Sequence, residues 1–162
     1  MSLLQEFHEY DPSKHKDAVH RLYKEVGWME EGEEEALDIF LSAGKGWVAE
    51  VENQAEAIAH TTPATLRYLE NDLQASCVTS VATSLIARKH RIATHLTAHA
   101  VAQDAIKGAL VSLLGVFEQG FYDQLGYGTG SYEQIVAFDP AKLMVKPSKR
   151  IPKRLHKENG EK

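Results

Sequence analysis

A basic cluster follows a β-branched segment near the middle of the chain. Residues 78–83 are mostly valine and threonine, and Arg88, Lys89 and Arg91 come directly before a helical apolar pattern in residues 92–100. The first amides of a helix lack intrahelical partners and carry partial positive charge, so they bind anions. Three cations beside such amides favour a multiply charged anion such as a pyrophosphate. The alternative is that they are ordinary solvated side chains of a surface turn.

Other residue groups predict less chemistry. His95 and His99 have the spacing of two metal ligands on a helix, but they lack the glutamate of an HExxH motif and an evident third ligand. We therefore expect no metal and place both histidines on the exposed side of the helix. Cys77 lies in a strand of small residues and is interpreted as a buried structural thiol. Ser80 is not part of the strained turn that presents a nucleophilic serine, so no hydrolase triad is predicted.

The basic cluster and a later segment together resemble one family. Residues 80–99 resemble motif A of the GCN5-related N-acetyltransferases (GNAT), in which a strand runs into a loop that wraps the pyrophosphate of acetyl-coenzyme A. Residues 113–140 resemble motif B, a strand followed by a helix with a tyrosine and then Leu-Gly-Tyr. The resemblance extends to about Val145. The chain is similar in particular to the amino-terminal domain of the enhanced-intracellular-survival type of acetyltransferase.

The resemblance implies a fold and a coenzyme site. The fold is one α/β (α+β) domain with a mixed, mostly antiparallel sheet, flanked by helices, that splays open between the strand ending near Thr83 and the strand from Ala109. Acetyl-coenzyme A would lie in this opening as the cosubstrate, with its pyrophosphate on the amides of residues 88–94. The cofactor-binding residues implied in this way are Val81, Ala82, Thr83, Arg88, Lys89, His90, Arg91, Ile92, Ala93 and Thr94.

Arg91 departs from the family's pattern. The family's loop has a glycine at this position, which lets the backbone approach the pyrophosphate without a Cβ in the way. A positive φ would strain Arg91 and weaken binding, whereas a negative φ would tolerate the side chain and add a charge. Positions that enter a helix are often compatible with negative φ, and Arg88 and Lys89 already mark the turn as anion-binding. We therefore predict a negative φ at Arg91.

The resemblance also implies a reaction. The chain would be an N-acetyltransferase that moves an acetyl group from acetyl-coenzyme A to an amine by direct attack in a ternary complex. Tyr122 stands where the family's tyrosine acts as general acid toward the departing thiolate, and Glu118, on the same helix face, is our choice of general base. The acceptor would be a small amine or a protein amino group. Two alternatives stay open, namely Tyr122 as a core aromatic and the whole chain as a truncated, non-catalytic coenzyme A binding or assembly module.

The charge is divided unevenly along the chain. A chain of 162 residues with 43% hydrophobic content suffices for one compact domain. Seven of the 18 Lys and Arg residues lie from Lys146 onward, where Glu158 and Glu161 are the acidic residues. The remaining body is acidic, which argues against nucleic-acid binding by the folded domain. We expect a GNAT domain over residues 1–145 and a basic, disordered tail over residues 146–162.

Cysteine usage and hydropathy bear on location. Cys77 is the single cysteine, so an intramolecular disulfide cannot form, and the chain begins without the pattern of a secretory signal. No apolar run approaches the roughly 20 residues that cross a bilayer. The sequence therefore predicts a cytoplasmic protein without a membrane partner, and it leaves a homo-oligomer open.

Apolar periodicity predicts the elements that position these residues. Strands are expected over residues 3–10, 46–51, 56–69, 74–83, 109–116 and 132–138, and helices after residues 11–13, after residues 30–35, over residues 92–107 and around residues 118–122. Pro63 cannot donate to a ladder, so we expect a break or bulge at residues 62–64. The acidic run at residues 30–35 either caps its helix or attracts a cationic amine.

Overall fold

The chain forms two compact units, Met1–Gly128 and Thr129–Lys162. The structure is a computed structural model that describes residues 6–115, 120–130, 135–142, 144, 154 and 156. Within this described part, all strands and α-helices belong to the first unit. Glu118 lies outside the described residues, as does most of the segment expected to be a basic tail.

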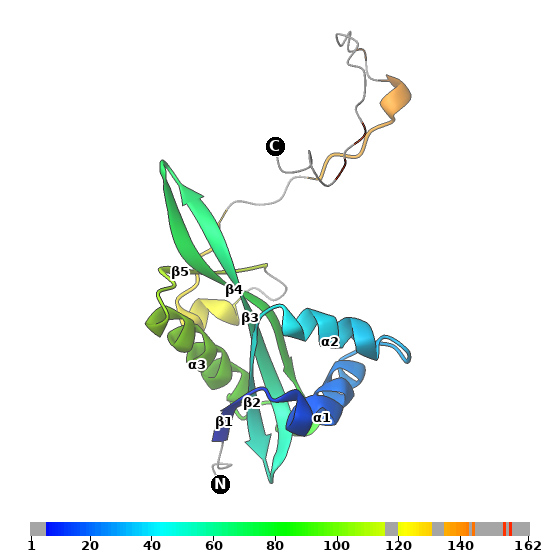
Figure 1. Ribbon diagram of the computed structural model, residues 1–162, viewed down its shortest axis with the longest axis vertical. Helices are drawn as coiled ribbons and strands as arrows, with labels where there is room; N and C mark the ends of the chain where they lie inside the picture. The colour runs from blue at the N-terminus through cyan, green and yellow to red at the C-terminus, as the bar shows by residue number, and fades with distance from the viewer. Residues whose placement is uncertain are drawn as a thin grey trace. The chain divides into compact units, whose positions relative to one another are not determined.

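Five strands form one mixed sheet in the order β1-β2-β3-β4-β5. Neighbouring strands are antiparallel except for β4 and β5, which are parallel. The strands are β1 (Glu6–Glu9), β2 (Lys45–Val51), β3 (Gln54–Tyr68), β4 (Asn71–Thr83) and β5 (Val111–Leu114), and the α-helices are α1 (Pro12–Glu25), α2 (Glu34–Ser42) and α3 (Ile92–Ile106). Helix α3 covers one face of the sheet, and α1 and α2 cover the other (Figure 1). The mixed, mostly antiparallel sheet flanked by helices is thus confirmed.

Helix α1 begins at a strong capping sequence. The Asp11 carboxylate accepts a hydrogen bond from the Ser13 amide at 2.9 Å, and Pro12 occupies the first turn, where its missing N–H costs nothing. Val19 and Leu22 then point into the sheet and are fully buried in the core that α1 and α2 share with β2 and β3. Burial of side chains of this size stabilises the packing by roughly 1.5 to 3 kcal/mol each.

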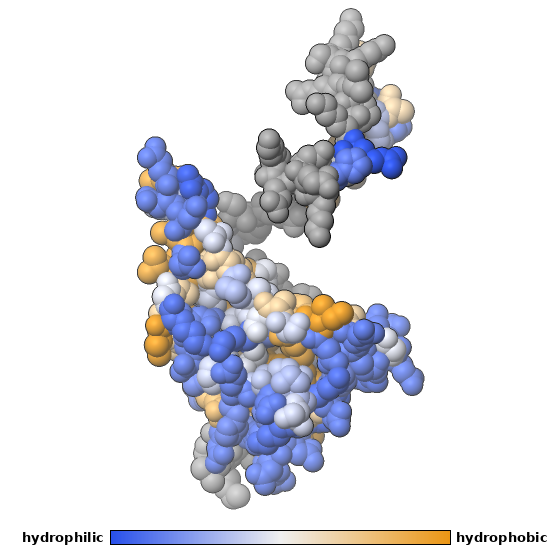
Figure 2. Space-filling view, in the orientation of Figure 1, coloured by the Kyte–Doolittle hydropathy of each residue, from blue (hydrophilic) through white to orange (hydrophobic). Residues whose placement is uncertain are grey.

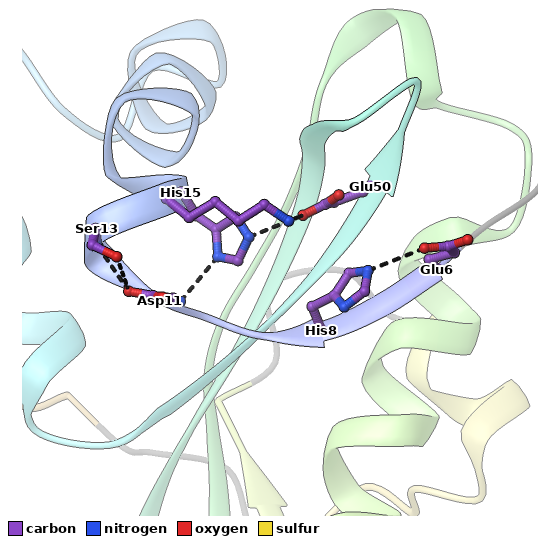
Figure 3. A network of polar contacts seen from close by, with 7 residues as sticks. Glu6, His8, Asp11, Ser13, His15 and Glu50 are labelled. Carbon is purple, nitrogen blue, oxygen red and sulfur yellow. Dashed lines mark hydrogen bonds and ion pairs between the residues drawn. The ribbon is translucent and has the colours of Figure 1, made fainter.

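A buried carboxylate ties the start of α1 to β2 (Figure 3). Glu50 Oε1 lies 2.6 Å from Lys14 Nζ and 3.0 Å from His15 Nε2. His15 Nδ1 accepts a hydrogen bond from the Asp11 amide, so the neutral ring carries its proton on Nε2 and donates it to Glu50. The Lys14 ammonium lowers the pKa of Glu50, and this effect outweighs the opposing effect of burial.

Helix α3 packs on the opposite face with the stripe that the sequence predicts. Ile92, Leu96 and Ala100 are each at most 1% exposed, and they pack against Ala57 and Ala59 of β3. The small alanine side chains let the helix approach the sheet closely. Gly108, with a φ of 105°, then ends this region of the chain and allows the turn into β5.

Pro63 does not interrupt β3, so the expected break at residues 62–64 is wrong. Pro63 pairs with Ser76 within a continuous strand, and the register shift occurs earlier, between His60 and Thr61. The ladder between β2 and β3 ends at Thr61. Beyond that point β3 pairs with β4 alone in a projecting hairpin (Figure 1), and a proline is tolerated where one side of a strand has no partner.

The expected last strand, residues 132–138, is not formed over its described part. Residues 135–138 have no regular structure, and Ile135, Val136 and Phe138 are 86%, 74% and 60% exposed. An apolar pattern favours a strand, but the pattern alone does not supply the hydrogen-bonding partner that a strand requires. The domain boundary near residue 145 stays a prediction.

Candidate active site

The sheet opens between β4 and β5. Parallel pairing runs from Ala75 opposite Val111 to Val78 opposite Leu114 and stops there, whereas β4 continues to Thr83. On the side that faces β5, residues 79–83 therefore have no partner strand within the described part of the chain. Their backbone groups are available to a ligand, in the place where the sequence predicts that the sheet splays.

A cavity of about 590 Å³ adjoins this opening. It is lined by the end of β4, the loop that follows, the first turn of α3, the end of α1 with its following loop, and the segment around Tyr122. The lining combines apolar side chains with cations. A pocket of this kind suits a ligand with an extended apolar arm and an anionic group.

The cavity collects most of the predicted site residues. Nine of the ten residues expected to bind the coenzyme line it, and His90 is the exception. The nine are Val81, Ala82, Thr83, Arg88, Lys89, Arg91, Ile92, Ala93 and Thr94. Val26, Trp28, Ala87 and Phe121 also line the cavity. Of these, the sequence indicates only the aromatic residues Trp28 and Phe121, as core or pocket walls.

The loop before α3 has an unusual backbone. A 3-10 turn, Leu85–Ala87, leads to an extended Arg88, and Lys89 and Arg91 then have φ values of 66° and 60°. The predicted negative φ at Arg91 is thus wrong. The chain has to turn sharply from the extended Arg88 into the helix within a few residues, and the left-handed conformation at Arg91 makes this turn.

Arg91 is the N-cap of α3 but cannot act as a cap. Its side chain has no hydrogen-bond acceptor, and α3 begins without a side-chain capping bond. The amides of the first turn therefore stay available to an anion, with Arg88, Lys89 and Arg91 lining the same cavity. The left-handed φ costs on the order of 1 kcal/mol for a residue with a Cβ.

Tyr122 also lines this cavity. It begins the 3-10 turn Tyr122–Leu125 and packs edge-on against Phe121, with ring centroids 4.9 Å apart, and against Tyr127 at 5.9 Å. Burial, followed by the proximity of Tyr127, raises the pKa of Tyr122. Its hydroxyl is therefore protonated at neutral pH and can donate a hydrogen bond. The geometry of Glu118 relative to Tyr122 lies outside the described residues.

The histidines and the cysteine differ in part from expectation. His95 is exposed as predicted, but His99 packs against Trp47 with ring centroids 4.5 Å apart, and it also contacts Phe7. The β1–β2 edge reaches further over α3 than the helical pattern indicates, which is why this ring is covered. Cys77 is half-buried on β4.

Among the described residues no three His, Cys, Asp or Glu side chains come together in a way that could hold a metal ion.

Two carboxylates of the acidic run serve the local backbone. Glu33 Oε2 accepts a hydrogen bond from the Glu30 amide at 2.9 Å, and Glu34 Oε2 accepts one from the Gly32 amide at 2.8 Å. Glu34 Oε1 also lies 2.6 Å from Lys24 Nζ, and this contact lowers the pKa of Glu34 to about 2. These bonds hold the turn before α2, whereas α2 itself begins without a side-chain capping bond. Glu34 and Glu35 lie in the first turn of α2, where the helix dipole favours carboxylates.

Of the helices in the described residues, none combines the length and the apolar character needed to span a membrane.

Comparison with protein families gives a match over this region. A family model described as an acetyltransferase (GNAT) domain matches residues 9–130. That span contains the sheet from its second strand to its fifth, the three α-helices and all residues that line the cavity. A search of curated proteins finds no match.

Solved structures share the fold at low sequence identity. A transcriptional regulator from Bacillus halodurans C-125 is 17% identical with a TM-score of 0.66, and the match covers 83% of this chain and 100% of that chain. Glucosamine-6-phosphate N-acetyltransferase from Arabidopsis thaliana is 14% identical with a TM-score of 0.65, over 84% and 99%. A predicted acetyltransferase from Clostridium acetobutylicum, solved with acetyl-coenzyme A, is 15% identical with a TM-score of 0.66, over 83% and 96%.

Proposed function

The chain belongs to the GNAT acetyltransferase domain family, and on this premise we propose that it transfers an acetyl group from acetyl-coenzyme A to an amine. The observation that carries the proposal is the cavity at the opening of the sheet. It brings nine predicted coenzyme-binding residues together with Tyr122, although these residues are spread over about 40 positions of the sequence.

The residues of the cavity suit each part of the coenzyme. The free amides at the start of α3 and the cations Arg88, Lys89 and Arg91 suit the pyrophosphate. Within the described residues, the backbone of residues 81–83 has no partner strand on the side that faces β5, which suits the amide groups of the pantetheine arm, since they can pair with β4 as a strand would. The arm then leads from the loop along β4 into the opening.

We propose direct attack in a ternary complex. Acetyl-coenzyme A supplies an acetyl group that is activated as a thioester. The amine nitrogen attacks the carbonyl carbon, the carbon–sulfur bond breaks, and the sulfur keeps the electron pair. Tyr122 stabilises this sulfur by hydrogen bonding. The phenol has an ordinary pKa about 1.5 units above that of a thiol and burial raises it further, so full proton transfer is uphill by roughly 2 kcal/mol or more and hydrogen bonding is the minimum role.

The acceptor remains a class of compounds in this proposal. The candidates are an aminoglycoside, a polyamine, another small amine and a protein amino group. The sequence offers Glu118 of motif B as one candidate for the general base. We also propose that the acetyltransferase domain extends to residue 145, that residues 146–162 form a basic tail, and that the protein is cytoplasmic.

Calorimetry with acetyl-coenzyme A, followed by a thiol-release assay over a panel of amines, tests the proposal. We expect binding of the coenzyme and amine-dependent release of its thiol. Binding without release for every amine would instead support a non-catalytic coenzyme A binding module. Absence of binding would overturn the proposal.

A further inference from the structure

Thr79 is an extra residue in β4. His60 of β3 pairs with Ser80, and the next residue, Thr61, pairs with Val78, so Thr79 bulges out of the ladder without a partner on β3. On its other side, β5 ends opposite Val78. Thr79 is thus the first residue of β4 beyond the point where the sheet opens, and its side chain is exposed.

The bulge lies where the opening between β4 and β5 begins. Thr79 and Thr83 are four residues apart, which corresponds to about 13 Å along a strand. If the pyrophosphate binds at residues 88–94 and the arm runs back along β4, the end that carries the thioester comes to the bulge. The Thr79 hydroxyl would then lie next to the thioester, where an amine attacks.

The Thr79 hydroxyl contacts a fully buried histidine. His60 Nδ1 lies 2.7 Å from Thr79 Oγ1, and His60 Nε2 lies 3.1 Å from the Leu41 carbonyl oxygen. The carbonyl can only accept, so Nε2 carries the proton of the neutral ring and Nδ1 presents its lone pair to the hydroxyl. The Thr79 hydroxyl therefore donates to His60 Nδ1, and its 3.2 Å contact with the His60 carbonyl is secondary.

The surroundings of His60 keep the ring neutral. Burial lowers its pKa, with a smaller opposing effect from the Leu41 carbonyl. Helix α2 places the Phe40 ring against it, with centroids 5.0 Å apart. Apolar surface is visible over α2 in Figure 2. From α1, the Tyr23 hydroxyl bonds to Ser80 Oγ at 2.5 Å, and burial raises the pKa of Tyr23, so this titratable group is uncharged at neutral pH. No ion pair among the described residues involves His60.

We propose that Thr79 and His60 form the path by which the attacking amine loses its proton, an inference that rests on the proposed acetyl transfer. As the nitrogen bonds to the acetyl carbon, its proton passes to Thr79 Oγ1 and the hydroxyl proton passes to His60 Nδ1. The imidazolium that forms is stabilised by the Leu41 carbonyl. The electron pair of the carbon–sulfur bond leaves with the sulfur, and solvent removes the proton from His60 after release of the products. Because its ring is buried, His60 does not touch the amine itself. It acts through Thr79 and is therefore a positioning residue.

Two substitutions at one position test this path. Thr79→Val keeps the shape and deletes the hydroxyl, whereas Thr79→Ser keeps the hydroxyl. We expect turnover to fall about 100-fold in Thr79→Val, which is the lower end of the effect of general base catalysis, and to stay within about fivefold in Thr79→Ser. Binding of acetyl-coenzyme A, measured by calorimetry, should stay within about twofold in both variants. Equal turnover in wild type and Thr79→Val would overturn the path.

The pH dependence separates proton transfer from a structural role. The ratio of wild-type to Thr79→Val turnover cancels the ionisation of the amine, which is the same in both reactions. If His60 receives the proton, the ratio is large at pH 8 and falls toward one as pH drops through the His60 pKa, below the ordinary value of about 6.5. A ratio that stays constant from pH 8 down to the lowest pH at which both proteins remain folded would mean a structural role for Thr79 and would overturn the path.

A third variant compares His60 with Glu118. In the Glu118→Gln background, we expect the ratio of turnover with and without the Thr79 hydroxyl to keep its pH dependence. Its disappearance would assign the proton to Glu118 and overturn the role of His60. If wild type binds acetyl-coenzyme A but acetylates no amine, the proposed function fails, and that outcome is distinct from an active enzyme that is indifferent to Thr79→Val.

Discussion

Gly44 packs directly against the ring of His60. A Cβ at Gly44 would lie 2.7 Å from His60 Cε1 and 2.1 Å from the Thr61 carbonyl oxygen. The second contact is with backbone, which a rotamer change cannot relieve. The turn between α2 and β2 therefore requires glycine because of close packing, and this packing fixes the position of the buried histidine behind Thr79.

Gly44→Ala should accordingly destabilise the protein. We expect a loss of about 2 kcal/mol or more in the free energy of unfolding, because overpacking against backbone forces the turn to move. Urea unfolding followed by circular dichroism measures this loss. Gly128→Ala is the matched control, since its added Cβ meets nothing within 4 Å, and it should stay within about 0.5 kcal/mol of wild type. Similar stability of the two variants would contradict the packing.

Glu50→Gln should lower the free energy of unfolding at neutral pH and weaken its decrease as the pH falls. The folded-state pKa of Glu50 is lowered, so the stabilisation is present above the unfolded pKa of about 4.3 and is lost as pH falls through the folded pKa. We expect a loss of about 1 to 3 kcal/mol at pH 7 that shrinks below pH 4. Urea unfolding at several pH values measures it. Glu6→Gln, at an exposed pair with His8, is the control and should change little.

Local sequence patterns predict the frame of this site well. The spacing of Ile92, Leu96 and Ala100 predicts the buried stripe of α3, and the β-branched run before Thr83 predicts the central strand. The order of strand, basic loop and helix follows from these patterns. Nine of the residues predicted to bind the coenzyme are contiguous with that frame, which explains why they line the cavity as a group.

The rest depends on constraints that local patterns do not encode. The φ of Arg91 is set by the path from the extended Arg88 into α3, and a sequence pattern does not define that path. His60 and Thr79 are 19 residues apart, and they meet through the pairing of β3 with β4, whose register and bulge a local pattern does not define. Trp28 reaches the cavity from a loop on the other side of the sheet.

Tyr122→Phe should lower turnover with little effect on coenzyme binding. The hydroxyl acts on charge that develops on sulfur during the reaction, so its loss affects the transition state more than the bound substrate. We expect a fall of about 100-fold in kcat and a change within twofold in the Kd for acetyl-coenzyme A. Because burial raises the pKa of Tyr122, ionisation of this group should not reduce wild-type activity below pH 10.

The adjacent tyrosine provides the control for this variant. Tyr127 contacts the Tyr122 ring, but its hydroxyl bonds to Ser112 Oγ at 2.5 Å and it is not among the residues that line the cavity. Tyr127→Phe should therefore keep most of the turnover. If Tyr122→Phe and Tyr127→Phe have the same small effect, Tyr122 is a packing residue.

The last prediction compares two substitutions at Arg91. Arg91→Gly and Arg91→Ala both remove the guanidinium, so they lose the same charge from the cavity. They differ in the Cβ, which at a φ of 60° costs on the order of 1 kcal/mol and lies on a loop that an anion has to approach closely. We expect Arg91→Gly to be more stable than Arg91→Ala by up to about 1 kcal/mol and to bind acetyl-coenzyme A about fivefold more tightly. Thermal unfolding and calorimetry at two salt concentrations measure the two effects, and tighter binding by Arg91→Ala would show that the left-handed conformation does not limit the site.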